Sequence, residues 1–388
     1  MKKLRVGVIY GGRSGEHEVS IASAASIIKH LDRSRYEPVP IRIEKDGRWT
    51  LADKAPTSIS AADVIEHARV EAARPARPGR EAHLVAHPGE DTVLAIERRP
   101  ASSDLDPSGT ATVTGVGLDV VFPVLHGPYG EDGTVQGLLE LANVPYVGPG
   151  VLGSAVGMDK AVMKTLFLAH KLPVGPYIVV LRPEWNADLA AVTARVTKEL
   201  GYPVFVKPAN LGSSVGISKV KAASDLAAAV ELALQFDRKV VIEAAVPNAR
   251  EIECAVLGND DAQASLPGEV IPSREFYDYE AKYLDDASQT VIPADLPASQ
   301  VREVQRLAIA AFRAADGAGM ARVDFFIDRE SGRIYLNEVN TIPGFTTISM
   351  YPKMWEASGL PYPALIDRLI TLALERHAEK QQLRTSVT

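Results

Sequence analysis

The residues best suited to chemistry lie near the end of the chain, in two short segments with the sequences ARVDFF and LNEVN. Both segments alternate between polar and apolar side chains with the period of two that is typical of β-strands, and a glycine-containing turn separates them. The first strand therefore carries Arg322 and Asp324 on one face, and the second carries Glu338 and Asn340 on one face. We expect the two strands to form a hairpin that brings the polar faces together.

The pairing of this hairpin decides what its polar face can do. If Phe326 pairs with Leu336, the carboxylates of Asp324 and Glu338 stand opposite each other, and the arginine stands opposite the asparagine. Two like charges directly opposed are destabilising, and a cation resolves the conflict. Because carboxylate and amide groups offer only oxygen, the sequence predicts a Mg²⁺ site at Asp324, Glu338 and Asn340. The alternative is a solvated polar sheet face, which leaves two carboxylates flanked by Phe and Ile unexplained.

A lysine followed by a loop of small residues is a second candidate site. Lys207 ends an apolar strand, and the sequence NLGSSVG follows it with amides that could cradle a phosphate. The Walker sequence G-x-x-x-x-G-K-[ST] occurs nowhere in the chain, so a nucleotide would have to be held in another way. Taken alone, the loop is equally compatible with an ordinary glycine-rich turn.

Further polar segments follow predicted strands or interrupt the pattern. GGRSGEHEVS lacks the glycine order of a dinucleotide site, and its Glu16 makes an amine a better ligand than a pyrophosphate. The alternative for Glu16 is a helix N-terminus, where the dipole favours acidic residues. His126 follows a buried strand, at the end where open α/β sheets present ligand groups. Residues 276–283 (FYDYEAKY) form either a loop that closes over a ligand or a plain surface loop.

These residues need strands and helices to position them. Residues 4–10 predict a strand, residues 19–31 a helix, and residues 39–43 and 120–125 two more buried strands, which together begin a parallel α/β layer. Residues 52–118 change in composition and read as an insertion, partly mobile and with little chemistry. The other predicted elements are helices at 134–141, 159–170, 224–235, 299–315 and 361–377 and strands at 176–181, 203–207, 215–220, 239–243, 250–257, 320–328 and 333–340.

Composition excludes several classes of protein. The chain has 388 residues, of which 46% are hydrophobic and 23% charged, as in ordinary globular proteins. Its 42 Lys and Arg against 49 Asp and Glu give a net charge of −7, so we expect no nucleic-acid partner. The single cysteine, Cys254, lies in an apolar strand and reads as a buried, inert thiol that needs no oxidising compartment.

No segment reads as a membrane anchor or a secretion signal. The apolar run near the N-terminus breaks at Gly11, too soon for a signal peptide. No stretch approaches the roughly 18 apolar residues of a spanning helix. We therefore expect a cytoplasmic protein with no membrane partner.

Seven segments in order resemble the D-alanine–D-alanine ligase family of the ATP-grasp superfamily, from Val6 to about Leu374 apart from residues 52–118. They are GGRSGEHEVS, HGPYGEDGTVQGLLE, GSAVGMDK, VKPANLGSSVGISKV, FYDYEAKY, ARVDFF and NEVNTIPGFTTISMYPKMW. The resemblance implies a three-domain α/β ATP-grasp fold: an N-terminal parallel α/β domain, residues 1–148, and two α+β domains, residues 149–245 and 246–388, that sandwich ATP. It implies ATP-dependent joining of two D-alanines through a D-alanyl phosphate for peptidoglycan, releasing ADP and phosphate, by a homodimer.

The resemblance also implies roles for single residues. ATP would be held by Lys160, Lys207, Ser214, Glu243, Val246, Glu251 and Lys282. Two Mg²⁺ or Mn²⁺ ions would be bound by Asp324, Glu338 and Asn340, with Glu338 bridging. D-alanine and the reacting groups would be held by Glu16, His126, Ser213, Lys282, Tyr283, Arg322, Gly344 and Ser349. Among these, Glu16, Ser213 and Tyr283 would form one hydrogen-bonded set. The chain departs from some relatives by having Leu211 in place of Glu and Ala244 in place of Lys.

Three other functions compete with this reading. An enzyme of the same fold that joins D-alanine to D-lactate typically carries His where this chain has Tyr283. A catalytically silent ATP-binding homologue would lack some of the arginine, carboxylate and amide residues of the hairpin, all of which are present. A dinucleotide-dependent oxidoreductase is disfavoured by the broken glycine fingerprint.

Overall fold

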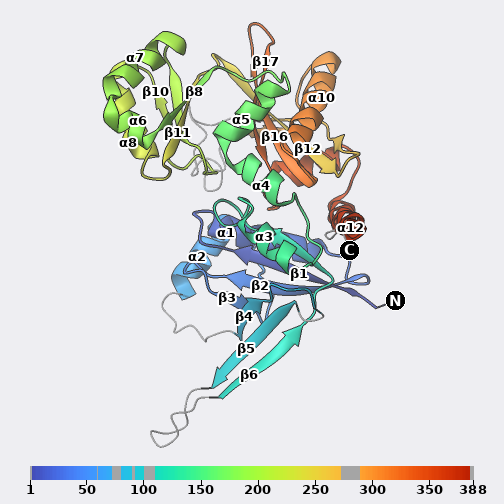
Figure 1. Ribbon diagram of the computed structural model, residues 1–388. Coiled ribbons are helices and arrows are strands. Elements are labelled where there is room, and N and C mark those ends of the chain that lie inside the picture. The colour runs from blue at the N-terminus through green and yellow to red at the C-terminus, as the bar shows by residue number, and fades with distance from the viewer. Residues whose placement is uncertain are drawn as a thin grey trace, which may run out of the picture.

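The computed structural model describes residues 2–58, 60–71, 80–89, 92–99, 110–271 and 289–384. The predicted loop at 276–283, with Lys282 and Tyr283, lies outside these ranges, and so do residues 72–79 of the segment predicted to be mobile. The described chain forms three sheets, which appear in Figure 1 as one body at the bottom and two at the top.

The first sheet begins as the predicted parallel layer. Strand β1 (Leu4–Gly11) pairs in parallel with β2 (Tyr36–Ile43) on one side and with β7 (Val120–Val124) on the other. The helices α1 (His17–His30) and α3 (Thr134–Leu141) pack on opposite faces of these strands. Both faces are buried, which explains why the strands read as continuous apolar runs.

The segment predicted as an insertion extends this sheet. Strands β3 (Trp49–Leu51), β4 (Arg80–Leu84), β5 (Val93–Arg99) and β6 (Thr110–Val116) add to β2 in antiparallel order. Helix α2 (Ala61–Glu71) packs against α1, and the β5–β6 hairpin projects away from the rest of the molecule (Figure 1). The sequence analysis missed these strands because β6, with the sequence TATVTGV, is largely exposed and lacks a clear apolar face.

The second sheet is antiparallel, with the order β10-β9-β11-β8. Its strands are β8 (Tyr177–Leu181), β9 (Val204–Pro208), β10 (Ser218–Val220) and β11 (Lys239–Ala244). Helices α6 (Arg182–Ala187), α7 (Leu189–Glu199) and α8 (Leu226–Ala233) cover one face. The strand predicted at 215–220 begins only at Ser218, because Ser213, Ser214 and Gly216 have positive φ angles and turn the chain.

The third sheet has the order β15-β14-β12-β16-β17, with β13 paired to β12. Its strands are β12 (Ala249–Gly258), β13 (Gln263–Ala264), β14 (Gly268–Ile271), β15 (Gln289–Val291), β16 (Gly319–Asp328) and β17 (Ile334–Asn340). Helix α10 (Ala298–Ala314) packs on one face, against the apolar positions that alternate along β12 and β16. The polar positions of those strands therefore point to the opposite face.

The predicted hairpin exists, with one correction to its register. Asp324 pairs with Glu338, as predicted, but Phe326 pairs with Tyr335 and not with Leu336. The shift is taken up by a β-bulge in which Asn337 is the additional residue. The pattern of alternating residues predicted the two strands, but it could not locate the bulge.

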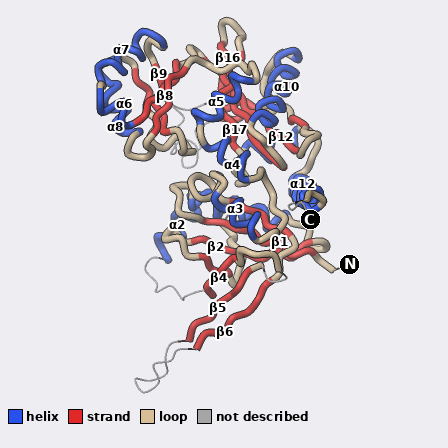
Figure 2. The backbone as a smooth tube through the Cα atoms, viewed as in Figure 1, coloured by secondary structure: helices blue, strands red, loops and turns tan. Residues whose placement is uncertain are grey.

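Three helices connect the bodies. Helix α4 (Val151–Met158) lies between the first sheet and the two others, whereas helix α5 (Lys160–Ala169) lies between the second and third sheets (Figures 1 and 2) and contacts β17. The final helix, α12 (Tyr362–Gln381), follows α11 (Met350–Ala357) and packs against α1 and β7 of the first sheet. Within the described residues, no helix combines the length and the apolar character that crossing a membrane requires.

Candidate active site

A row of three acids crosses the polar face of the third sheet. Glu253 of β12 pairs with Asp324 of β16, and Asp324 pairs with Glu338 of β17. Directly paired residues of an antiparallel sheet point to the same side, so the three carboxylates share one face. Arg322 lies on that face and binds both neighbouring acids: its Nε and a terminal nitrogen lie 2.8 Å from the two Asp324 oxygens, and its Nε lies 3.0 Å from Glu253 Oε2.

The predicted metal ligands are close together and are all oxygen donors. Asn340 donates from its Nδ2 to Asp324 Oδ2 at 2.9 Å, and Glu338 Oε2 lies 3.6 Å from the ammonium of Lys160. Within the described ranges, no three His, Cys, Asp or Glu side chains form a metal-binding group, so a site here would use two carboxylates and one amide. Asp324 and Glu338 are paired, and Arg322 contacts the first of them while Lys160 contacts the second. Paired carboxylates of this kind suit a hard divalent cation.

Helix α5 begins at a capped N-terminus and carries two buried lysines. The Asp159 side chain accepts hydrogen bonds from the backbone N–H of Ala161 and Val162, each at 3.1 Å, which satisfies two free donors of the first turn. Lys160 donates from its Nζ to the Leu211 carbonyl at 2.7 Å. Position 211 therefore contributes its backbone here, whichever side chain it carries.

The second sheet supplies a buried ion pair. Lys207 of β9 and Glu243 of β11 project from the face opposite the covering helices, and their Nζ and Oε2 lie 3.0 Å apart. Burial lowers the pKa of a lysine, but the Glu243 and Glu338 carboxylates outweigh it and raise the pKa of Lys207. Burial raises the pKa of Glu243, but Lys164 and Lys207 outweigh it and lower that pKa. The pair is therefore charged.

Sequence reasoning did not find Lys164, one turn along α5 from Lys160. Its Nζ donates to the Asn337 carbonyl at 3.0 Å and lies 3.2 Å from Glu243 Oε1. Burial lowers its pKa, and Glu243 opposes that shift. The signal in the sequence was the spacing of two lysines four residues apart on an otherwise apolar helix.

The loop after β9 reaches the first sheet at Glu16. The Ser213 hydroxyl donates to Glu16 Oε1, which places two members of the predicted hydrogen-bonded set in contact, while Tyr283 lies outside the described residues. A Cβ added to Gly212 would lie 3.1 Å from Glu16 Oε2, so the loop backbone approaches the carboxylate closely. Ser214 lies in the same turn, in a left-handed conformation.

His126 is buried beside this region. Its Nδ1 lies 3.0 Å from the Ile342 carbonyl, so this nitrogen carries the proton. Burial lowers the pKa of the imidazole, and Glu16 only partly offsets the effect. Nε2 is therefore an acceptor, and within the described residues it is buried without a hydrogen-bond partner. Such a nitrogen suits a ligand that donates a hydrogen bond.

Glu131 is a further acid that the sequence analysis did not assign. Its Oε1 accepts the Gly127 N–H at 2.8 Å, which closes the turn that follows His126. Burial and the neighbouring Glu16 carboxylate raise the pKa of Glu131 to about 8. The signal in the sequence was the first acid of the HGPYGEDG segment.

The remaining predicted residues surround these groups at element boundaries. Gly344 and Ser349 lie in the segment before α11, where a Cβ on Gly344 would be 2.9 Å from Ser349 Oγ, and Thr346 donates its N–H to the same oxygen at 3.0 Å. Glu251 shares a face of β12 with Glu253, and Val246 lies between β11 and β12. Ala244 ends β11, with its N–H bonded to the Pro176 carbonyl at 3.0 Å.

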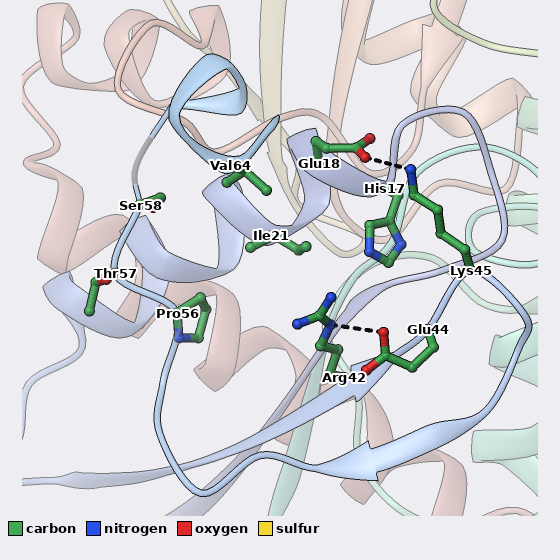
Figure 3. Close-up of a pocket in the computed structure, with 10 residues that line it drawn as sticks. All are labelled: His17, Glu18, Ile21, Arg42, Glu44, Lys45, Pro56, Thr57, Ser58 and Val64. Atoms are coloured by element: carbon green, nitrogen blue, oxygen red, sulfur yellow. Dashed lines mark hydrogen bonds and ion pairs between the residues drawn. The ribbon is translucent and has the colours of Figure 1, made fainter. Parts of the chain in front are cut away.

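A separate cavity of about 520 Å³ lies beside α1 (Figure 3). Its charged side chains pair with each other: Lys45 Nζ lies 2.6 Å from Glu18 Oε1, and Arg42 Nε lies 3.3 Å from Glu44 Oε2. None of the predicted site residues lines it; the lining consists of His17, Glu18, Ile21, Arg42, Glu44, Lys45, Pro56, Thr57, Ser58 and Val64. The predicted site residues that the structure describes therefore lie outside this cavity.

Comparison with known proteins agrees with this arrangement. Residues 5–149 match the family described as D-ala D-ala ligase N-terminus, and residues 166–371 match D-ala D-ala ligase C-terminus. The chain is 50% identical over 386 residues to a D-alanine–D-alanine ligase of Heliobacterium modesticaldum, covering 99% of this chain and 98% of that one.

Solved structures give the same result. The D-alanine–D-alanine ligase from Coxiella burnetii superimposes with a TM-score of 0.80 at 38% identity, covering 98% of this chain and 97% of that one. The VanG D-Ala:D-Ser ligase from Enterococcus faecalis superimposes with a TM-score of 0.79 at 32% identity, covering 96% and 100%.

The fold is that of an ATP-grasp ligase, as predicted, with two sheets that carry lysines and carboxylates facing one another beside an α/β domain. The chain belongs to the D-alanine–D-alanine ligase family.

Proposed function

We propose that the protein joins two molecules of D-alanine to D-alanyl-D-alanine, converting ATP to ADP and phosphate through a D-alanyl phosphate. The observation that carries the proposal is the carboxylate row of the third sheet, with Asp324 and Glu338 in register and lysines of α5 and β9 at its edge. That arrangement suits phosphoryl transfer, which depends on positioning and on charge neutralisation more than on covalent chemistry by the protein. The full-length identity to D-alanine–D-alanine ligases supports the choice of substrate.

In the first step, the carboxylate of one D-alanine attacks the γ-phosphate of ATP. Glu16 holds the ammonium of that D-alanine, and His126, neutral and with an acceptor at Nε2, supports the same group. Lys160 and Lys207 bind the phosphates, and Lys282 approaches the phosphate that is transferred. Their positive charges stabilise the charge that gathers on the phosphate oxygens.

In the second step, the amine of the other D-alanine, having lost a proton, attacks the acyl phosphate carbonyl. The carbonyl carbon becomes tetrahedral and its oxygen becomes negative, and phosphate then leaves as the amide bond forms. Arg322 and the Gly344 amide stabilise the oxyanion, and Ser349 binds the carboxylate of the second substrate. Preorganised donors of this kind are typically a large part of such catalysis.

The other nucleotide contacts follow from the same arrangement. Glu243, Val246 and Glu251 bind the base and ribose, and Ser214 contributes from the loop after β9. Asp324, Glu338 and Asn340 would hold two Mg²⁺ or Mn²⁺ ions, which would supply positive charge to neutralise the phosphates.

We also propose the setting in which the reaction takes place. The three domains comprise residues 1–148, 149–245 and 246–388, and the enzyme acts as a homodimer. It works in the cytoplasm, where ATP is available and where the single free thiol is compatible with a reducing environment. The dipeptide product serves peptidoglycan synthesis.

One assay tests the proposal. Purified protein with ATP and Mg²⁺ is given D-alanine, L-alanine, D-alanine plus D-lactate, or D-alanine plus D-serine, with phosphate release measured and products resolved by mass. We expect D-alanine alone to give the dipeptide and L-alanine to give none. ATP binding without turnover on D-alanine would instead identify a silent homologue or another acid substrate.

The acceptor specificity can be tested at one position. Tyr283→His introduces the residue typical of ester-forming relatives, and we expect it to shift preference at the second site from D-alanine towards D-lactate. The measurement is the ratio of dipeptide to depsipeptide when both acceptors compete. An unchanged ratio would count against a role for Tyr283 in acceptor choice.

A further inference from the structure

Two lysines of one helix hold two consecutive residues of one strand. Lys160 faces the Glu338 carboxylate at 3.6 Å, and Lys164, one turn further along α5, donates to the carbonyl of Asn337 at 3.0 Å. The same helix makes a third tie, since the Val339 N–H donates to Met163 Sδ at 3.3 Å. Helix α5 is thus fixed along the edge of the third sheet, at the bulge.

Lys164 is also one of two cations on a single carboxylate. Glu243 presents Oε1 to Lys164 at 3.2 Å and Oε2 to Lys207 at 3.0 Å. The side chains of both lysines are almost fully buried, with exposed fractions of 3% and 8%. A buried carboxylate with a single cation would draw that cation onto both of its oxygens, because an unpaired buried oxygen is costly.

The bulge residue lies between the same two lysines. Asn337 accepts from Lys164 at its backbone oxygen and from Lys207 at its Oδ1, the latter at a longer 3.4 Å. It directly precedes Glu338, which pairs with Asp324. Lys164 therefore contacts both the Glu243–Lys207 pair of the second sheet and the carboxylate strand of the third.

We infer that Lys164 is a positioning residue for the nucleotide: by occupying Glu243 Oε1 and the Asn337 carbonyl, it keeps the ammonium of Lys207 directed at the phosphates and holds Glu338 in register. This inference rests on the proposed function. Without the Lys164 ammonium, Glu243 binds Lys207 with both oxygens. The bulge residue Asn337 then keeps its contact with Lys207 but loses the hydrogen bond to its carbonyl. Nucleotide affinity then falls, while the D-alanine site, which includes Glu16 and His126, is unaffected.

The test compares Lys164→Met with Lys198→Met, a matched loss of an exposed lysine on α7. We expect Lys164→Met to weaken ADP binding, measured by calorimetry, and to raise the KM for ATP, each by about tenfold, which corresponds to one buried charged contact. The KM for D-alanine should stay within about twofold, and Lys198→Met should change none of these values. Unchanged ADP binding by a folded Lys164→Met protein would overturn the inference.

A second variant separates positioning from general stability. In a Glu243→Gln background, the carboxylate that competes for Lys207 is absent, so adding Lys164→Met should weaken ADP binding by less than about threefold. A full tenfold loss in that background would contradict the mechanism. The double variant leaves Lys207 as the remaining buried charge of this pair, offset by the Glu338 carboxylate, and its comparison with Glu243→Gln also carries the test if Lys164→Met does not fold. Because ADP binding needs no D-alanine, these outcomes are separate from failure of the proposed ligation.

Discussion

At the scale of single residues, the site is organised by like charges brought together. Asp324 lies between two acids across the sheet, and Arg322 binds two of the three. This cluster was predictable because strand alternation places residues on faces without any tertiary information. Lys164 was not predictable in the same way, since it binds the Asn337 carbonyl 173 residues away. For Glu131, the Glu16 carboxylate that helps to raise its pKa lies in a distant segment of the chain.

Removing either central charge should separate activity from folding. We expect Asp324→Asn or Glu338→Gln to lower phosphate release by at least about a hundredfold, because cation and phosphate binding depend on these charges. The fold should survive, since each change relieves a like-charge contact. Circular dichroism checks that the fold survives, and the phosphate assay measures the loss of activity.

The control for those variants is Glu330→Gln, which changes an exposed acid in the turn between the same two strands. Its activity should match that of the wild type. Substantial activity in Asp324→Asn or in Glu338→Gln would remove the basis for placing a cation there.

The single thiol allows a prediction that is independent of function. Cys254 is fully buried in β12, and burial raises the pKa of its thiol to about 12. A protonated, inaccessible thiol does not react. With a thiol reagent at pH 8, we expect no reaction in the native protein and one equivalent after unfolding in guanidinium; rapid reaction of the native protein would mean that β12 opens.

At the scale of elements, most helices and strands formed where alternation and caps predicted them. Helix α5 is a good example, since the range 159–170 predicted from sequence differs from the observed Lys160–Ala169 by one residue at each end. The bulge at Asn337 could not be predicted, because it depends on the pairing of β16 with β17. The late start of β10 could not be predicted either, because two serines with positive φ angles turn the chain before it. Strand β6 was missed for a different reason, namely that an exposed edge strand has a weak apolar period.

The cap of α5 should matter for stability and for nucleotide binding together. Asp159→Ala removes an acceptor from two backbone N–H groups and a partner from Lys239. We expect a loss of about 1–2 kcal/mol, as is usual for a lost N-cap, and a higher KM for ATP because Lys160 begins the helix. Asp159→Asn, which keeps a capping oxygen, should lose less in urea unfolding; equal losses would assign the effect to the Lys239 ion pair.

At the scale of the whole molecule, the last helix packs against both the first and the third sheet. Helix α12 packs on α1 and β7, its Arg376 lies over the Tyr146 ring at 4.5 Å, and Arg376 also donates to the Tyr146 carbonyl at 3.1 Å. The overall three-body architecture was predictable from the resemblance, but this return of the C-terminus was not. It depends on apolar positions of α12 that would fit any buried surface.

The contact between Arg376 and Tyr146 can be tested by substitution. We expect Arg376→Ala to destabilise the protein by about 1 kcal/mol, the usual size of a partly desolvated cation–π contact with its hydrogen bond. Arg368→Ala, on the same helix, removes only an exposed pair with Glu375 and should change the thermal midpoint little. Equal shifts in the two midpoints would show that Arg376 adds nothing beyond surface charge.

The return of α12 also constrains how the protein is made. The core that contains Val6, Val8 and Ile27 also contains Leu365 and Leu369, so this core cannot be completed until nearly the whole chain has been synthesised. During translation, that apolar face stays exposed while the second and third sheets emerge from the ribosome. Since domains generally fold in the order of synthesis and exposed apolar surface promotes aggregation, we expect the nascent chain to benefit from chaperones. Ribosomes arrested before residue 362 should therefore carry a protease-sensitive N-terminal domain.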